Sequence, residues 1–319
     1  MSPTTTVPDD SAWPALPYGA WKDTCETLQL WTQIVGKVRL ARTPWLNHSW
    51  HVALYVTARG LGTGPIAHDR RSFNLEFDFV DQALRVRTSG GGMKSIRLEA
   101  MAVATFYQRV LETLGDLGVP VAIDGAPNEM AEAIPFREDR RLRPYDADYA
   151  HRFWRVLLQA DRLLGLFRTG FLGKSSPVHF FWGSFDLAVT RFSGRPAPPH
   201  PGGAPHLPDA VVREAYSHEV SSAGFWPGGG AIDYPAFYAY AYPEPAGFRT
   251  AQVAPPGAFY SPALSEYLLP YEVARAAADP DQAVLAFLSS TYGAAADGGG
   301  WERAALECDL GRPGVVRPA

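Results

Sequence analysis

Residues 176–195 read SPVHFFWGSFDLAVTRFSGR, and this stretch decides how the second half of the chain folds. Residues 178–192 have strand character on either side of Gly183-Ser184, a pair that is typical of a tight turn. The pattern predicts two antiparallel strands joined by that turn. Such a hairpin would bring His179 and Asp186 towards each other across the two strands.

Similar patterns along the rest of the chain complete the fold prediction. Strands are predicted over residues 50–57, 72–79, 83–88, 95–98, 119–123 and 237–242. Helices are predicted over residues 24–42, 103–118, 147–171, 261–278 (interrupted at Pro270) and 281–296. We therefore expect an α+β fold with two α+β halves, antiparallel sheets, helices on the outer faces and a central cleft.

An aperiodic stretch separates the two halves. Residues 126–146 show neither the helical nor the strand spacing of apolar residues. They are predicted to connect an N-terminal half, residues 1–125, to a C-terminal half, residues 147–319. Within the second half, the proline-rich residues 195–208 predict a rigid surface loop or a strap across the surface.

The composition is that of a globular protein and excludes several classes of partner. The chain has 319 residues, of which 46% are hydrophobic and 19% charged, with a net charge of −4. A charge so near neutral gives no field for holding phosphate backbones, so we expect no nucleic-acid partner. No apolar run reaches the roughly 18–20 residues of a membrane span, and no secretory signal is visible at the N-terminus. We expect a cytoplasmic protein without a membrane partner, in which Cys25 and Cys308 are reduced thiols.

Several long blocks rich in tryptophan and histidine carry a resemblance to a known family. They read WPALPYGAWKDT (13–24), TPWLNHSWHVALYVTARGL (43–61), SPVHFFWGSFDLAVTRFSGR (176–195), EAYSHEVSSAGFWPGGG (214–230) and PAFYAYAYPEP (235–245). The chain resembles a bacterial family catalogued only as a domain of unknown function, over residues 13–307. The resemblance implies one family unit that spans the chain, and it brings no activity, ligand or cofactor with it.

Nucleotide cofactors are disfavoured. Gly173-Lys174-Ser175 matches the end of a phosphate-binding loop, but Arg168 stands where that motif needs a glycine, and a helix is predicted where it needs a strand. No GxGxxG motif occurs in the chain. We therefore expect the protein to carry no tightly bound nucleotide.

Two histidine–carboxylate pairs are candidate catalytic residues. His179 with Asp186, and His218 with Glu219, each place an imidazole near a carboxylate that can orient it and raise its basicity. A divalent metal held by histidines together with Glu219 or Asp186 is a further alternative, because imidazole and carboxylate suit Zn, Fe or Mn. The spacing matches no established metal-binding motif, so the ligands and the cofactor stay open.

Aromatic and cationic side chains are candidates for binding a substrate. Tyrosines at alternate strand positions form a flat, amphipathic wall that suits stacking on a ring or a sugar face. Lysine is rare in this arginine-rich chain, so a retained Lys174 indicates a need for its compact charge or its adjustable pKa. The candidate binding residues are His48, His51, Lys174, Trp182, Trp226, Tyr238, Tyr240 and Tyr242.

These candidates favour an enzyme that acts on a small organic substrate, with or without a ring, by acid–base chemistry of histidine and carboxylate groups. The alternative is a non-catalytic small-molecule-binding or scaffold protein in which the same side chains are buried and fully hydrogen-bonded. The substrate, the reaction and the oligomeric state do not follow from the sequence.

Overall fold

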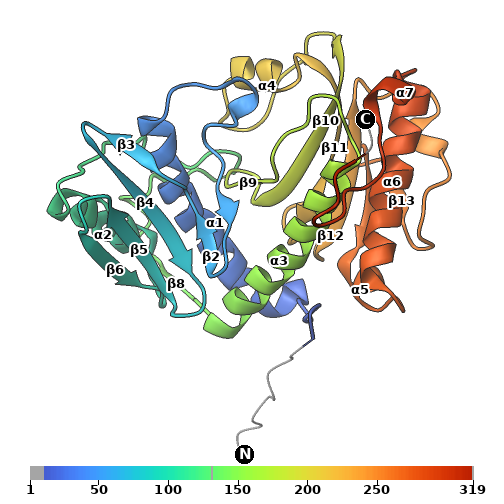
Figure 1. Ribbon diagram of the computed structural model, residues 1–319. Coiled ribbons are helices and arrows are strands. Elements are labelled where there is room, and N and C mark those ends of the chain that lie inside the picture. The colour runs from blue at the N-terminus through green and yellow to red at the C-terminus, as the bar shows by residue number, and fades with distance from the viewer. Residues whose placement is uncertain (1–10, 131, 318–319) are drawn as a thin grey trace, which may run out of the picture.

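The computed structural model describes residues 11–130 and 132–317, and it shows a mixed α+β fold with antiparallel sheets (Figure 1). One sheet, called here the N-terminal sheet, contains β1 (Tyr55–Val56), β2 (Gly60–Gly62), β3 (Ile66–His68), β4 (Arg71–Asp78), β5 (Ala83–Thr88) and β6 (Met93–Arg97). Its strand order is β1-β2-β4-β5-β6, and β3 pairs with β4. The strands predicted over 72–79 and 83–88 are confirmed.

The second sheet, called here the C-terminal sheet, is formed by chain segments after residue 178. It contains β9 (His179–Phe181), β10 (Asp186–Pro196), β11 (His218–Trp226), β12 (Ala236–Tyr242), β13 (Phe259–Ser261) and β14 (Glu266–Pro270). The order is β13-β14-β12-β11-β10-β9, and every pair is antiparallel. The predicted hairpin is confirmed, since Asp186 of β10 pairs with Phe181 of β9 across the turn.

Long helices lie between the two sheets as well as outside them (Figure 1). Helix α1 (Tyr18–Arg42) contacts β3, and α2 (Val103–Asp116) contacts β6, so both pack on the N-terminal sheet. Helix α3 (Ala147–Thr169) contacts β1 as well as β10 and β11, and α6 (Pro280–Gly298) covers β11 and β12. The helices predicted on the outer faces thus include two, α1 and α3, that fill the space between the sheets.

A continuous hydrophobic core joins the two halves. In the N-terminal half, Trp31 of α1 stacks on Phe106 of α2 at 4.6 Å between ring centroids. In the C-terminal half, Phe153 of α3 stacks on Phe185 at 5.3 Å, and all these side chains belong to one continuous buried cluster. Because large aromatic side chains are buried on both faces of the central helices, the two sheets are held by shared packing.

Short elements complete the described chain. They are η1 (Asn47–Ser49), β7 (Met101–Ala102), β8 (Leu142–Arg143), α4 (Asp209–Ala215), η2 (Phe248–Thr250), α5 (Tyr271–Arg275) and α7 (Arg303–Leu306). None of the helices in residues 11–130 and 132–317 is long and apolar enough to cross a bilayer.

Three stretches differ from the sequence prediction. Residues 50–57 form a strand only at Tyr55–Val56, because the backbone turns through left-handed conformations at His48 and Ser49 with φ of 61° and 57°. Residues 119–123 form no strand. The helix predicted over 261–278 is instead β13, β14 and the short α5, because β12 offers its free edge to residues 266–270.

Candidate functional site

The C-terminal sheet has one apolar face and one polar face, set by the alternation of its strands. Leu187 and Val189 of β10 are buried on the face that α3 covers, together with Phe225 of β11 and Phe237 of β12. The opposite face carries polar side chains from the same strands: Asp186, Thr190, Ser222, Tyr238 and Tyr240. A polar sheet face of this kind needs water, a partner or a ligand above it.

A cavity of about 580 Å³ lies over this polar face. Its floor is the polar face of β10, β11 and β12, and its roof is α4 with the preceding proline-rich loop. Its walls come from α1, η1 and residues 124–129. The volume falls within the roughly 300–1,000 Å³ of small-molecule sites in proteins.

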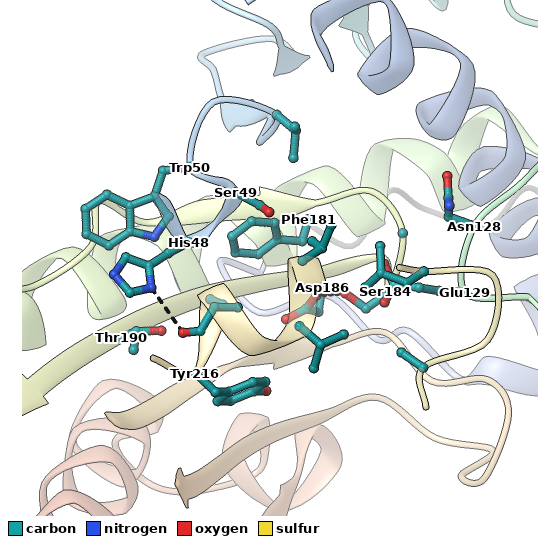
Figure 2. Close-up of a pocket in the computed structure, with 18 of the residues that line it drawn as sticks. His48, Ser49, Trp50, Asn128, Glu129, Phe181, Ser184, Asp186, Thr190 and Tyr216 are labelled. Carbon is teal, nitrogen blue, oxygen red and sulfur yellow. Dashed lines mark hydrogen bonds between the residues drawn. The ribbon is translucent and has the colours of Figure 1, made fainter. Parts of the chain in front are cut away.

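Carboxyl groups gather at one end of the cavity without a cation. Figure 2 shows Asp186 and Ser184 next to Glu129, which comes from the segment before α3. Within the described residues, neither Glu129 nor Asp186 forms an ion pair with lysine, arginine or histidine, and the same holds for Glu266 on neighbouring β14. We call Glu129, Asp186 and Glu266 the carboxyl cluster.

Burial shifts the titration of all three members of the carboxyl cluster. It raises the pKa of Glu129 to about 7, and the nearby Asp186 raises it further. Glu266 follows the same pattern, with a pKa raised to about 7 by burial and by Asp186. Burial also raises the pKa of Asp186, against the effect of hydrogen bonds donated by Ser184, at 2.5 Å, and by Tyr238. Near neutral pH Glu129, which lines the cavity, can therefore exchange a proton with a bound molecule.

Glycine at position 183 makes room for Glu129. A Cβ at this position would lie 2.0 Å from Oε1 of Glu129, which is closer than side chains approach each other in proteins. The turn between β9 and β10 therefore positions the Glu129 carboxyl group against the end of the sheet.

Hydroxyl groups extend from the carboxyl cluster across the floor. Oη of Tyr216 lies 2.9 Å from Oη of Tyr240, and Oγ1 of Thr190 lies 2.9 Å from Oγ of Ser222. The rings of Tyr238 and Tyr240 are parallel within 12° at 6.2 Å, so they form the wall that the alternate tyrosines predict. This row of donors and acceptors can orient the polar groups of a ligand.

Lys37 brings a buried cation to the wall of the cavity. Lys37 lies within α1, its side chain lines the cavity, and the residue is only 3% exposed. Its ammonium group donates to Oδ1 of Asn128 at 2.5 Å, and no ion pair of Lys37 occurs in the described part of the chain. Burial lowers the pKa of Lys37, while the more distant Asp124 opposes this shift.

His48 links the wall to the roof. Its Nε2 accepts from Nζ of Lys174 at 2.8 Å, which leaves Nδ1 to donate to the carbonyl of Ala215 in α4 at 3.1 Å. Figure 2 shows this second bond and places His48 and Trp50 at the opposite end of the cavity from Glu129. Nε1 of Trp45 also donates to Oε2 of Glu214, so two hydrogen bonds hold α4 over the cavity.

The predicted catalytic pairs do not form. His179 is 1% exposed, lies outside the cavity lining and contacts Oη of Tyr55 through Nε2 at 3.4 Å. Burial lowers its pKa to about 4, so the imidazole is neutral and serves packing. His218 contacts Oγ of Ser217 at 3.0 Å, and Glu219 pairs with Arg195 at 2.7 Å. Of the four predicted catalytic side chains, Asp186 alone lines the cavity, and its partners are the two hydroxyl groups already described.

The predicted binding residues divide into two groups. Those that line the cavity are His48, Trp182, Tyr238 and Tyr240. Those outside the lining are His51, Lys174, Trp226 and Tyr242. Among these, Lys174 acts on the cavity through His48, whereas Tyr242 donates to the carbonyl of Pro198 and His51 contacts the backbone of Leu46. Tyr242 and His51 thus hold loop backbone in place.

Sequence reasoning missed Glu129, Lys37 and Tyr216. Glu129 lies in the predicted connection, residues 126–146, where apolar residues have no regular spacing, so no sequence signal indicated it. Lys37 did carry a signal, because it interrupts the apolar stripe of a core-facing helix between Ile34 and Val38.

No group of three or more His, Cys, Asp or Glu side chains among the described residues is arranged to hold a metal ion. The metal alternative therefore gains no ligand set from the geometry.

Comparison with known proteins identifies a family and no activity. A family model matches residues 13–308, and its description is "Family of unknown function (DUF5996)". No curated protein matches the sequence, and no solved structure matches it.

Proposed function

This chain belongs to that family of unknown function, and we propose from the cavity that the protein binds a small organic molecule and acts on it by acid–base chemistry. Glu129 and Asp186 are the proposed acid–base groups, in place of the histidines that the sequence suggested. The floor tyrosines and the aromatic wall would hold the molecule.

The observation that carries the proposal is the juxtaposition of Glu129 and Asp186 in a cavity of about 580 Å³. A buried carboxyl group normally gains an arginine or lysine partner, or hydrogen-bond donors that hold it ionised. Glu129 has neither within the described residues, and its pKa is about 7. A group that titrates near neutral pH can give a proton in its acid form and take one in its ionised form.

The electrostatic coupling between Glu129 and Asp186 supports different roles for the two carboxyl groups. Asp186 is held by Ser184 and Tyr238, whereas the Glu129 carboxyl group has no such hydrogen bond from the residues that the structure describes and would be able to contact a ligand. When one carboxyl group ionises, it raises the proton affinity of the other, so the pair tends to share one proton. We assign proton transfer to Glu129 and the tuning of its proton affinity to Asp186.

The test is a search for binding followed by a search for turnover. A panel of small organic metabolites is screened against the parent protein by thermal shift, and stabilising compounds are incubated with it and followed by mass spectrometry. Glu129→Gln keeps the shape of the side chain and removes the proton, so it should retain binding and lose turnover. Glu112→Gln, on the exposed face of α2, is the matched control.

Two outcomes contradict the proposal. A panel without any stabilising compound argues against a ligand site. Turnover that persists unchanged in Glu129→Gln removes this residue from the chemistry and favours a protein that only binds.

The cytoplasm is the compartment that we propose. Cys25 is buried and Cys308 is partly buried, and both are free thiols, as expected in a reducing environment.

A further inference from the structure

The ammonium group of Lys37 receives less stabilisation from the described residues than a buried charge normally does. An ammonium group that is removed from water is stabilised by a carboxylate or by several acceptors. Among the residues that the structure describes, Lys37, at 3% exposure, has one amide oxygen as its hydrogen-bond acceptor, and an ammonium group has three donors. The side chain lines the cavity wall.

The other lysines of the chain show what the usual arrangement looks like. Lys22 pairs with Glu26 at 3.8 Å and Lys94 pairs with Asp116 at 2.5 Å, both on the surface. Lys174 and Lys37 are the two beside the cavity, and their partners are a neutral imidazole and a neutral amide. Positive charge therefore lies beside the cavity without a carboxylate in hydrogen-bond contact with it, within the described residues.

A purely structural role for Lys37 would be to hold Asn128 in place through their hydrogen bond. That role is already filled by Gln33, one turn earlier on α1. Its Nε2 donates to the carbonyl of Asn128 at 2.9 Å, and its Oε1 accepts from the backbone N–H of Asn128 at 2.7 Å. An uncharged side chain thus tethers the same residue, so the tether alone does not explain a buried charge.

We infer that the ligand of this cavity carries an anionic group of carboxylate size that pairs with Lys37. The inference rests on the proposed function and narrows it to organic acids with an aromatic or other apolar body. The carboxylate would accept from the free N–H groups of Lys37, while Trp182 and Phe181 contact the apolar part. Trp182 is itself held firmly, because its Nε1 donates to the carbonyl of Val52 at 2.9 Å.

A matched set of probes tests the charge of the ligand. Indole-3-propionate is the anion, indole-3-propionamide is its neutral isostere, and tryptamine carries the opposite charge. Isothermal titration calorimetry at pH 7 should show the anion binding at least about tenfold more tightly than the amide, and tryptamine the most weakly. An anion beside the carboxyl cluster favours its protonated form, so binding should also take up protons, measured by repeating the titration in buffers of different ionisation enthalpy.

Variants separate pairing with the ligand from tethering of Asn128. Lys37→Met should reduce the affinity for indole-3-propionate to that of the amide, and Lys37→Arg should retain the preference for the anion. Gln33→Leu removes the tether without removing a charge, so it should also retain the preference.

The outcomes are distinct. Binding of the amide or of tryptamine as tightly as the anion overturns the anionic ligand and leaves the proposed function standing. An equal loss of anion and amide binding in both Lys37→Met and Gln33→Leu makes Lys37 a tether and overturns the inference. If none of the three probes binds the parent protein, both the inference and the proposed function are contradicted for aromatic ligands of this size.

Discussion

Two buried aspartates, one on each sheet, have opposite electrostatic surroundings. Asp78 on β4 is fully buried, and it accepts hydrogen bonds from Nε of Arg59 at 2.6 Å and from Nε of Arg85 at 2.9 Å. Burial alone would raise its pKa, but these arginines and two backbone N–H groups hold the pKa well below the usual range. Asp186 on β10 has hydroxyl partners instead, and burial raises its pKa.

The comparison shows that the partners of a buried carboxyl group decide in which direction its pKa shifts. On the N-terminal sheet Arg87 also pairs with Glu76, at 2.8 Å. Asp78 and Glu76 are therefore both paired with arginine. On the C-terminal sheet no cation of the described chain pairs with the carboxyl cluster, and two of its members, Glu129 and Asp186, line a cavity. The same alternating sequence pattern therefore produces a stabilising ionic face in one half and a candidate site in the other.

The largest difference between the two sheets should appear when each aspartate is replaced by asparagine. Asp78→Asn removes the buried charge that Arg59 and Arg85 share and leaves them only the half-exposed Asp81 as a counter-ion, so it should lower the free energy of unfolding by about 3 kcal/mol at pH 7. Asp186→Asn keeps one acceptor oxygen, its amide N–H can donate to the oxygen of the other hydroxyl group, and it removes a group that resists ionisation, so the change should stay within about 1 kcal/mol. Urea unfolding at pH 7 measures both, and equal losses would contradict the distinction between the faces.

The same comparison predicts that acid removes the contribution of Asp78 to the free energy of unfolding. Because the folded pKa of Asp78 is depressed, its contribution is present above the unfolded pKa of about 3.8 and is lost as the pH falls through the folded value. The stability gap between the parent protein and Asp78→Asn should therefore narrow when urea unfolding is repeated below pH 4.

Histidine substitutions test which imidazoles belong to the fold. His179 is packed against Trp50 and Tyr55, with ring centroids at 5.9 and 5.5 Å, so His179→Ala should lower the free energy of unfolding by about 2–3 kcal/mol. His218 is only partly buried and contacts its own neighbour, so His218→Ala should cost under about 1 kcal/mol. Thermal melting of both variants decides, and a mild effect of His179→Ala would reopen its assignment to a site.

The fold was predictable where periodicity is strong. Helices α1, α2, α3 and α6 and strands β4 and β5 follow from regular spacing of apolar side chains, because one face of each is packed against the core. The failures occur where tertiary pairing overrides local preference. Residues 266–270 contain helix-forming leucine and glutamate, yet they pair with the edge of β12.

The candidate site was predictable in its strand residues and in two residues outside strands, His48 and Trp182. Tyr238 and Tyr240 follow from alternation on β12, since alternate side chains share a face, and Asp186 follows from the predicted hairpin. Glu129 comes from a segment without a period, and its approach to Gly183 depends on how residues 124–129 cross the end of the sheet. A long-range contact of that kind leaves no mark in one sequence.

The pH dependence of stability tests the carboxyl cluster directly. The pKa of Glu129 rises from 4.5 to about 7 on folding, so its favourable contribution is complete below pH 4.5 and is lost as the pH rises through 7. Glu129→Gln should match the parent protein near pH 4.5 and exceed its free energy of unfolding by about 1–2 kcal/mol at pH 8, allowing for partial exposure. Urea unfolding across this range, with Glu112→Gln as the control, should show the gain in Glu129→Gln alone; parallel pH profiles would mean that Glu129 is already ionised in the fold.

The smallest effect on stability should come from Gly183→Ala, which isolates the position of the Glu129 carboxyl group. The new Cβ would lie 2.0 Å from Oε1 of Glu129, so the carboxyl end must move, and a flexible side chain can do so at little cost. We expect a change of under about 1 kcal/mol in the free energy of unfolding at pH 5. A displaced Glu129 leaves Asp186 and gains contact with water, so its folded pKa should fall towards the usual value and the loss of stability between pH 5 and pH 8 should shrink. Urea unfolding at the two pH values measures that loss in the parent protein and in Gly183→Ala. If the loss is unchanged in Gly183→Ala, the cause of the raised pKa lies in burial of the whole segment and not in the close approach of Glu129 to the turn.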